Sequence, residues 1–175
     1  VVAAARSLGL AFEAIRQGFA TFQGVKRRQE VLAEVGGVTV IDDFAHHPTA
    51  VRETIAAVRH GYPGRRLWAV FEPRSNTSRR NIHQEEYARA FTGAARVSLK
   101  VPEPHDMVPV DQQLDVARLI AALRHQGIDA AAETEVDALV AEVARGARPG
   151  DVVLVMSNGA FGGFVPKLLA ALARP

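Results

Sequence analysis

Side chains that commonly bind ligands gather directly after a short apolar segment near residue 40. Residues 38–41 are all β-branched and three of them are apolar, which favours a buried strand, and Asp42 and Asp43 follow them directly. His46 and His47 come next, and the proline after them can open a helix because its missing N–H is tolerated there. We therefore expect this cluster between a strand's carboxyl end and a helix N-terminus, where open α/β sheets bind ligands.

Three roles are open for the cluster on the residues alone. A carboxylate can accept a hydrogen bond from a ribose hydroxyl, and an imidazole can stack on a base or contact phosphate. Asp42, Asp43, His46 and His47 are also plausible metal ligands, as in a metal-dependent hydrolase, although adjacent histidines rarely reach one ion. The third interpretation is structural, with one aspartate capping the next helix and one histidine packing beneath it.

A second polar stretch, EPRSNTSRR at 72–80, follows another apolar run that we expect to form a buried strand. Arg74 offers a planar guanidinium that can hold a carboxylate or phosphate through two hydrogen bonds. Ser75, Asn76 and Thr77 add short side chains with hydrogen-bond donors. The stretch suits a loop that binds a small carboxylate, and a solvated turn is the structural alternative.

A third stretch, SNGAFGG at 157–163, follows the apolar run VVLVM. Its first residues are Ser157, Asn158 and Gly159. Glycines let backbone N–H groups approach a ligand closely, and the N-terminus of the helix expected next favours an anion. The glycine spacing differs from the dinucleotide-binding fingerprint, and a tight strand-to-helix turn explains the pattern nearly as well.

Strands and helices must alternate along the chain to bring these three loops together. The hydrophobic patterns predict a hairpin around Gly36–Gly37 and then an alternation typical of a mostly parallel, Rossmann-like sheet with helices on both faces. The carboxyl ends of parallel strands share one edge, so the three loops should meet there. The predicted strands are 31–34, 38–41, 67–71, 97–101, 130–132 and 152–156, the helices are 48–60, 84–91, 115–126, 136–145 and 164–174, and residues 102–109 form a loop.

The first 22 residues follow a different pattern. They are rich in alanine and carry apolar residues at three- and four-residue steps, which predicts two short helices separated near Gly9. Such a pair cannot bury its apolar face by itself. We therefore expect residues 1–23 to be the tail of a preceding domain and residues 24–175 to form one α/β domain. Because the sequence starts with valine, we expect it to be part of a longer protein.

Bulk composition narrows the class of protein. The chain has 175 residues, 48% hydrophobic and 23% charged, which is typical of a globular protein. A net charge of +2 gives no argument for nucleic acid, and no apolar run is long enough to cross a membrane. Cysteine is absent, which excludes disulfides and thiolate metal sites and leads us to expect a cytoplasmic protein. There is no G-x-x-x-x-G-K-[ST] phosphate loop.

Four motifs, taken in order, resemble the C-terminal domain of the Mur ligases, the ATP-dependent amide-forming enzymes of peptidoglycan synthesis. They are GVKRRQE (24–30), DDFAHHPT (42–49), EPRSNTSRR (72–80) and GDVVLVMSNGAFGG (150–163). Residues 1–23 resemble the last helices of the family's central ATPase domain. EPRSNT and SNGAFGG are most similar to the peptidoglycan-recycling branch, which joins L-Ala-γ-D-Glu-meso-diaminopimelate to UDP-N-acetylmuramate. The branch that adds L-alanine shares the DD-aromatic-x-HHPT stretch and is the alternative.

The resemblance implies a reaction in which ATP phosphorylates the muramate carboxylate and the peptide amine attacks the acyl phosphate. The phosphate loop, the Mg²⁺ ligands and the muramate pocket would lie on the N-terminal and central domains, so this domain alone should be inactive. It would close over the nucleotide and bind the incoming amine, with no catalytic residue or metal ligand of its own. The resemblance assigns nucleotide binding to Arg28, Asp43 and His46, and substrate binding to Arg74, Ser75, Asn76, Thr77, Ser157, Asn158 and Gly159.

Asn81 and His83 match nothing in the family pattern, so the far end of the second loop is not placed. His47, next to His46, is expected to be structural. A nucleotide-binding module without chemistry is a further alternative to a ligase and to a metal-dependent hydrolase.

Overall fold

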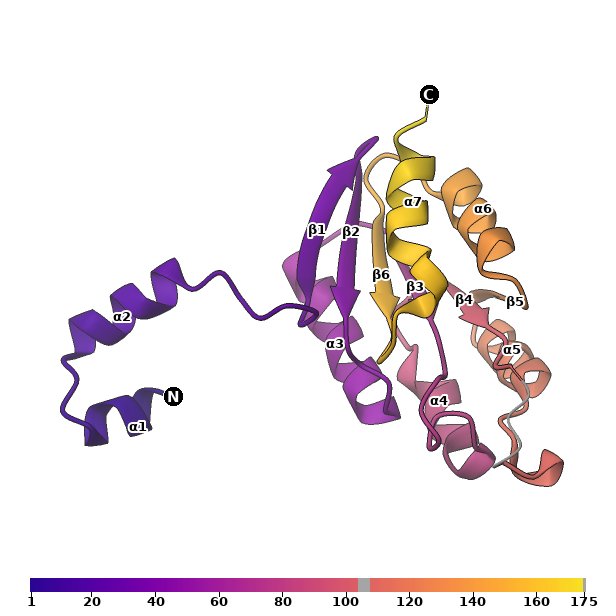
Figure 1. Cartoon of the computed structure of the whole chain (residues 1–175), viewed down its shortest axis with the longest axis horizontal. Coiled ribbons are helices and arrows are strands. Elements are labelled where there is room, and N and C mark those ends of the chain that lie inside the picture. The colour runs from indigo at the N-terminus through magenta and orange to yellow at the C-terminus, as the bar shows by residue number, and fades with distance from the viewer. Residues whose placement is uncertain (104–107, 175) are drawn as a thin grey trace.

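A six-stranded sheet forms the centre of the computed structural model, which describes residues 1–103 and 108–174 (Figure 1). The strand order is β1-β2-β6-β3-β4-β5. Strand β1 is antiparallel to β2, and every other neighbouring pair is parallel. The strands are β1 (Glu30–Val35), β2 (Val38–Asp43), β3 (Leu67–Phe71), β4 (Arg96–Lys100), β5 (Asp129–Glu133) and β6 (Val152–Met156).

Helices cover both faces of this sheet, and the side chains of each strand alternate between two hydrophobic layers. Figure 1 shows α3, α4 and α5 on one face and α6 and α7 on the other. In β3, Leu67, Ala69 and Phe71 pack in the layer that holds α3, α4 and α5, whereas Trp68 and Val70 pack against α6 and α7. Because both faces are covered, the central strands are apolar throughout. The helices are α3 (Pro48–Gly61), α4 (Gln84–Ala90), α5 (Val116–His125), α6 (Val136–Gly146) and α7 (Phe164–Leu172).

Local sequence signals explain where several elements begin and end. The proline at the start of α3 occupies the first turn, where its missing N–H costs nothing. Asp115 caps α5, since its Oδ1 accepts the Arg118 N–H at 2.8 Å. Gly36 and Gly37, at φ values of 58° and 75°, make the turn between β1 and β2, and only glycine adopts two such positions in succession at little cost.

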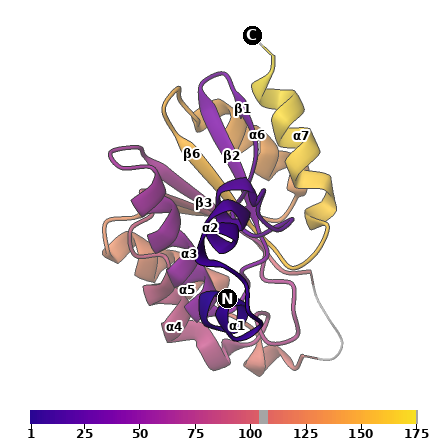
Figure 2. The same cartoon turned by 90° about the vertical axis from the view of Figure 1, so that its left-hand side faces the viewer.

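The N-terminal residues form an arm that projects from the body (Figures 1 and 2). The arm contains α1 (Val2–Ser7) and α2 (Phe12–Thr21), and Ile15 is its one buried side chain. Phe12, Phe19 and Phe22 are more than half exposed, so the arm carries an apolar face that this body does not cover. No helix in the described part of the chain is both long and apolar enough to cross a membrane.

The predicted elements are confirmed, with their ends within two residues of the observed ones. Gly9, at φ 81°, lies between the two arm helices as expected. Three short 3₁₀ turns were not predicted: Asn81–His83, Val110–Gln112 and Phe161–Gly163. The last of these forms the second half of the predicted glycine-rich loop. Residues 104–107 of the predicted loop 102–109 lie outside the described residues. The domain boundary after residue 23 stays a prediction.

Candidate functional site

Three loops leave the same edge of the sheet at the same level. We call them loop 1 (44–47, after β2), loop 2 (72–80, after β3) and loop 3 (157–163, after β6). Strand β6 lies between β2 and β3, and Met156 pairs with Asp43 on one side and Phe71 on the other. The ladder continues one step further, because Ser157 N–H donates to the Asp43 carbonyl at 3.1 Å and Glu72 N–H to that of Met156 at 3.0 Å. Loop 3 therefore lies between loops 1 and 2, and the three loops meet at this edge as predicted from the sequence.

Arg27, which sequence reasoning did not single out, ties loop 3 to the end of β2. Its Nη2 donates to the carbonyl oxygens of Ser157 and Gly159 at 2.6 and 2.9 Å, and its Nε donates to Asp42 at 3.1 Å. Its backbone has a φ of 57°, and its N–H donates to Glu30 at 2.7 Å. Burial raises the pKa of Asp42 above its ordinary value, an effect that the Arg27 guanidinium opposes.

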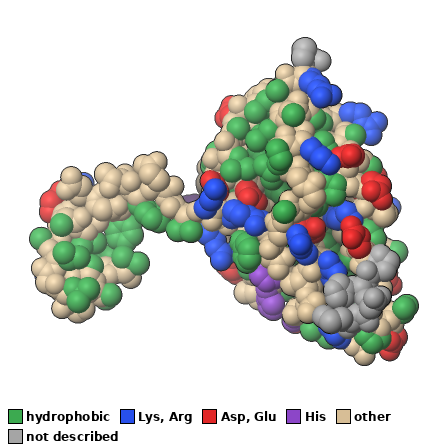
Figure 3. Space-filling model, in the orientation of Figure 1, with side chains coloured by type: hydrophobic (Ala, Val, Ile, Leu, Met, Phe, Trp, Pro, Cys, Tyr) green, Lys and Arg blue, Asp and Glu red, His purple; other side chains and the backbone are tan. Residues whose placement is uncertain are grey.

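Arg28, the predicted nucleotide contact, has a side chain directed differently from its neighbour. It is exposed, and its guanidinium carbon lies 5.1 Å from the centre of the Phe44 ring, a cation–π contact. On the face drawn in Figure 3, basic side chains gather close to the point where the N-terminal arm joins the body. Arg28 is thus free to reach an anion at the edge of the sheet, next to loop 1.

The carboxylate of Asp43 is buried and already bonded to protein donors. Only 4% of it is exposed, and its Oδ2 accepts the Gln29 N–H at 2.8 Å. Its Oδ1 accepts the Ala45 N–H at 2.7 Å and the Thr54 hydroxyl at 3.4 Å. The carboxylate therefore holds loop 1 to the Arg28 segment and to α3. Its predicted contact with a ribose stays a prediction, and it would require one of these protein donors to be replaced.

The two histidines of loop 1 have separate surroundings. His46 is partly buried, with Nδ1 3.0 Å from the Phe44 carbonyl oxygen, and its own carbonyl accepts the Tyr87 hydroxyl. His47 is exposed at the N-terminus of α3, where its Nδ1 accepts the Thr49 N–H at 3.4 Å. This capping contact agrees with the structural role expected of His47. The nucleotide contact predicted for His46 stays a prediction.

His83, which the family pattern did not place, lies beside loop 1. Its ring centre is 4.7 Å from that of His47, and its Nδ1 contacts the Glu86 carboxylate. Tyr87 lies next to it and is largely buried, which raises the pKa of its phenol, as does the Glu86 charge. His83 therefore joins the start of α4 to the start of α3.

Loops 2 and 3 meet where Arg74 passes over Gly159. A Cβ built on Gly159 would lie 2.0 Å from Nη1 and 2.4 Å from Cδ of Arg74, so the contact leaves no room for a side chain at this position. Arg74 is exposed and makes no hydrogen bond or ion pair with the described residues. A guanidinium that is held by packing and has its N–H groups free can bind a carboxylate by donating hydrogen bonds to it.

The other residues predicted for the substrate divide into internal and outward-facing side chains. Ser75 holds loop 2 together, because its Oγ accepts the Ser78 N–H at 3.0 Å. Asn76 and Thr77 are exposed, with no side-chain partner among the described residues. Ser157 is buried and donates to Glu72 while accepting the Gly159 N–H at 2.9 Å, so it shapes loop 3 from within.

Asn158 differs from its serine neighbour. Its Oδ1 is buried and has no hydrogen-bond partner among the described residues. A buried amide oxygen without a donor is costly, and a ligand or a neighbouring domain that supplied a donor would remove that cost. The structure therefore places all seven predicted substrate residues on two touching loops, where the side chains of Ser75 and Ser157 bond within their own part of the site and those of the others make no hydrogen bond with the described residues.

The sequence model of the family described as "Mur ligase, glutamate ligase domain" matches residues 27–159, which is more than half of the chain and includes all three strand-end loops up to Gly159. The chain belongs to the Mur ligase family. The resemblance inferred from the four motifs is confirmed, as is the fold expected from it.

Two curated Mur ligases illustrate the similarity. One is the Escherichia coli UDP-N-acetylmuramate–L-alanyl-γ-D-glutamyl-meso-2,6-diaminoheptandioate ligase, 41% identical over 174 residues. The other is a UDP-N-acetylmuramate–L-alanine ligase of Nostoc punctiforme, 35% identical over 179 residues. Each alignment covers 99% of this chain but 36% of the relative, so the chain spans about a third of the length of these relatives.

Two solved Mur ligase structures superpose on the chain. A domain of a ligase from Haemophilus ducreyi, described for the same tripeptide, aligns over 83% of this chain and 100% of its own, with a TM-score of 0.68 and 38% identity. A murein peptide ligase from Psychrobacter arcticus aligns over 99% of this chain and 35% of its own, with a TM-score of 0.73 and 32% identity.

The metal-hydrolase alternative finds no support in the geometry of this Mur ligase domain. Within residues 1–103 and 108–174, no three His, Asp or Glu side chains are placed to hold one metal ion. Asp43 is occupied by protein donors, and His46 and His47 point to different partners. The cluster that suggested a metal site instead organises loop 1.

Proposed function

We propose that this chain is the part of a Mur ligase that binds the incoming amine and closes the nucleotide site, in an enzyme that joins L-Ala-γ-D-Glu-meso-diaminopimelate to UDP-N-acetylmuramate. ATP would phosphorylate the muramate carboxylate, and the free amine of the peptide would displace the phosphate. The observation that carries the proposal is the meeting of loops 2 and 3, where Arg74 lies over Gly159 with its donors free.

The order of strands in the sheet supports a division of labour along its edge. Loop 1 and the exposed Arg28 lie on the β2 side of loop 3, and loop 2 lies on the β3 side. We assign the nucleotide to the first side, through Arg28, His46 and the loop that Asp43 organises, and the peptide to the second. Loop 3 lies between them, so the acyl phosphate and the attacking amine would meet above it.

Chemistry on a phosphoryl group needs compensation of its negative charge, which Mg²⁺ supplies in such reactions. Following the family resemblance, we assign the Mg²⁺ ligands to parts of the enzyme outside this chain. Its own residues bind and orient: Arg28 contacts phosphate, and Arg74, Asn76 and Thr77 hold substrate carboxylates. None of them is assigned as a general base.

The test is a phosphate-release assay on the full-length enzyme. Release should require UDP-N-acetylmuramate together with the tripeptide, and Arg74→Ala should raise the tripeptide KM roughly tenfold or more with little change in the ATP KM. A hydrogen bond to a charged group is typically worth ~1.5–3 kcal/mol, which sets this expectation.

Arg145→Ala provides the matched control. Arg145 is an exposed arginine on α6 whose Nε donates to the Ala141 carbonyl of its own helix at 3.1 Å, so its removal should change neither KM. An equal rise in the ATP and tripeptide KM values for Arg74→Ala would show that loop 2 has been assigned to the wrong substrate.

The same assay distinguishes the second candidate, ligation of L-alanine to UDP-N-acetylmuramate. The 35% identity to the Nostoc punctiforme L-alanine ligase over nearly the whole chain keeps this candidate open. L-Alanine would then support phosphate release and the tripeptide would not. Release that responds to neither amine would count against a ligase and favour a nucleotide-binding module.

A further inference from the structure

A hollow of about 370 Å³ extends the amine side of the site to a fourth strand end, that of β4. It lies between loop 2, loop 3 and the residues that follow β4, and the motifs had connected the two loops with each other but not with the end of β4. Volumes of this order are at the lower end of those of small-molecule sites. Its lining consists of Glu72, Pro73, Arg74, Arg79, Lys100, Val101, Pro102, Glu103, Ala160 and Gly162.

Lys100, the last residue of β4, is a buried cation in this lining. Only 6% of it is exposed, and its Nζ donates to the Val101 carbonyl at 2.9 Å. No carboxylate in the described part of the chain lies within ion-pair distance of it, in contrast to Lys167, which pairs with Asp137 at 2.6 Å. Burying a charge without a counter-charge is unfavourable, so the position of Lys100 calls for an anion.

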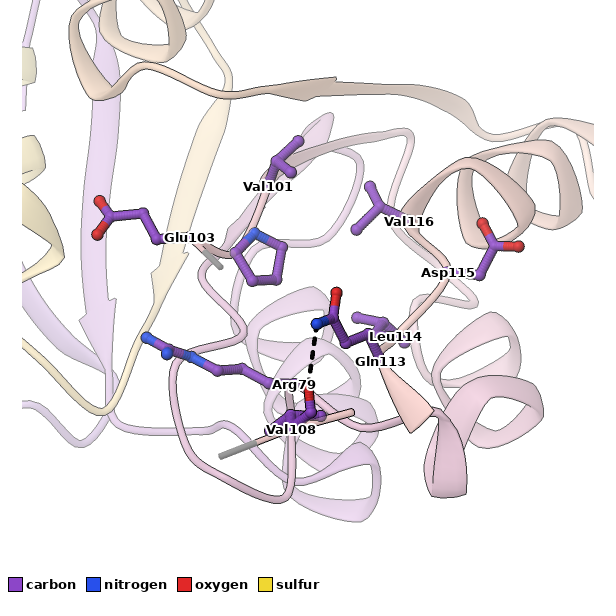
Figure 4. Close-up of a pocket in the computed structure, with 9 residues that line it drawn as sticks. Arg79, Val101, Glu103, Val108, Gln113, Leu114, Asp115 and Val116 are labelled. Carbon is purple, nitrogen blue, oxygen red and sulfur yellow. Dashed lines mark hydrogen bonds between the residues drawn. The ribbon is translucent and has the colours of Figure 1, made fainter. Parts of the chain in front are cut away.

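Arg79 provides a second unpaired cation in the same wall. Its Nε is buried and has no acceptor among the described residues. Figure 4 shows its side chain extending from loop 2 toward the side on which Glu103 lies. Arg79 lines both this hollow and a neighbouring one of about 280 Å³. The backbone holds it in place, because the Arg79 N–H donates to Ser75 at 3.1 Å and its carbonyl accepts the Leu114 N–H at 2.7 Å.

Among the described residues that line the hollow, the charges do not balance. Arg74, Arg79 and Lys100 contribute three positive charges, and Glu72 and Glu103 contribute two negative ones, which leaves a net charge of +1. Glu72 already accepts the Ser157 hydroxyl. An anionic group of a ligand would restore neutrality, give the Arg79 Nε an acceptor and give Lys100 a counter-charge.

We propose that Lys100 and Arg79 form a carboxylate subsite for the amine substrate, at a distance from its reacting amine and next to Arg74. This subsite rests on the proposed function and adds to it a basis for selectivity. L-Alanine carries its one carboxylate beside the amine, whereas the tripeptide carries further carboxylates along its length. A site with cations both on loop 2 and at the end of β4 favours the longer, acidic substrate over the small one.

The experiment measures KM for ATP, UDP-N-acetylmuramate and tripeptide in the full-length enzyme with Lys100→Met, Arg79→Met and Lys167→Met. Lys100→Met and Arg79→Met should each raise the tripeptide KM roughly ten- to a hundredfold, as expected for a lost hydrogen bond between charged groups. The other two KM values should stay within about twofold, and Lys167→Met, which removes an exposed lysine on α7, should change none of them.

A substrate series separates binding from a structural effect. Tripeptides in which one carboxylate at a time is replaced by a carboxamide should include one that wild type binds weakly and for which Lys100→Met causes no further loss. Because Lys100 has no carboxylate partner within residues 1–103 and 108–174, Lys100→Met should not lower the melting temperature. Arg79→Met gives an independent variant, since its side chain comes from a different element.

Each outcome leads to a separate conclusion. Three results would overturn the subsite: an unchanged tripeptide KM in Lys100→Met and Arg79→Met, an equal rise in all three KM values, or a carboxamide series in which Lys100→Met weakens the binding of every member. In each of these cases, ligation of the tripeptide by the wild-type enzyme would still uphold the proposed function. Wild-type enzyme that ligates L-alanine but not the tripeptide would overturn the proposed function and, with it, the subsite.

Discussion

Removing the guanidinium of Arg27 tests whether this residue holds the three loops together. Arg27→Met keeps most of the apolar stem but loses the hydrogen bonds to Asp42, Ser157 and Gly159, at 3.1, 2.6 and 2.9 Å. Hydrogen bonds to charged groups contribute ~1.5–3 kcal/mol each when shielded from water. The side chains of Arg27 and Asp42 are 30% and 14% exposed, so solvent reduces these values and we expect a total loss of ~2–3 kcal/mol in unfolding free energy.

The pH dependence of this loss follows from Asp42. Burial already raises the pKa of Asp42, and without Arg27 beside it that pKa should rise further. The folded variant would then bind a proton at Asp42 more tightly than the unfolded chain, whose aspartate has a pKa of ~3.9. Its stability should fall as the pH rises from that value through the raised one, so the difference from wild type should be larger at pH 7 than at pH 4.

The assay is urea unfolding of the chain at both pH values, with Arg28→Met as the matched control. Arg28 is the next residue and is exposed, so its replacement should cost no more than about 0.5 kcal/mol. Equal losses for the two variants, or a loss for Arg27→Met that does not shrink at pH 4, would refute the role assigned to Arg27.

Two further predictions concern other contacts of the same body. Gly159→Ala should displace Arg74, whose Nη1 would lie 2.0 Å from the new Cβ, and raise the tripeptide KM of the full-length enzyme several-fold; an unchanged KM would show that the position of Arg74 is not needed. Asp151→Asn should lower the unfolding free energy at pH 7 by ~2 kcal/mol, because Arg66 binds both carboxylate oxygens of Asp151. Burial alone would raise the pKa of Asp151, but the hydrogen bonds from Arg66 and the Arg148 N–H lower it. The stability that Asp151 contributes is therefore present above the unfolded pKa of ~3.9 and is lost as the pH falls through the lowered pKa of the folded state. A difference between Asp151→Asn and wild type that persists unchanged in urea melts at pH 2 would contradict the assignment.

The sequence was sufficient to predict most of the fold because its hydrophobic periods are strong. The apolar runs 67–71 and 152–156 are the observed strands β3 and β6, residue for residue, since strands buried on both faces must be apolar throughout. The three polar loops were predictable for the same reason, as each begins where such a run ends. Short 3₁₀ turns such as Asn81–His83 were missed because they carry no period of their own.

Side-chain direction within a motif could not be predicted in the same way. Arg27 and Arg28 have the same chemistry and adjacent positions, and the left-handed backbone of Arg27 decides which of them points inward. Asp43 was a candidate for binding a ribose because it follows a predicted strand and matches the family motif, yet two backbone N–H groups already occupy its oxygens. Lys100 attracted no attention within the predicted strand 97–101, because its burial away from every described carboxylate is visible only in three dimensions.

The position of β6 in the sheet links these observations. As the last strand in the sequence it could have been added at an edge, but it is inserted between β2 and β3 and pairs with both in register. This insertion puts loop 3 between the two other loops. Arg27 therefore binds the carbonyl groups of loop 3 from the β2 side, and Arg74 packs on Gly159 from the β3 side. A movement of loop 3 would therefore shift the contacts of both arginines. Binding of ATP on the nucleotide side should then change the affinity of the site for the amine substrate. Because such coupling is reciprocal, ATP and the tripeptide should change each other's dissociation constants by the same factor, and Arg27→Met should reduce that factor toward one.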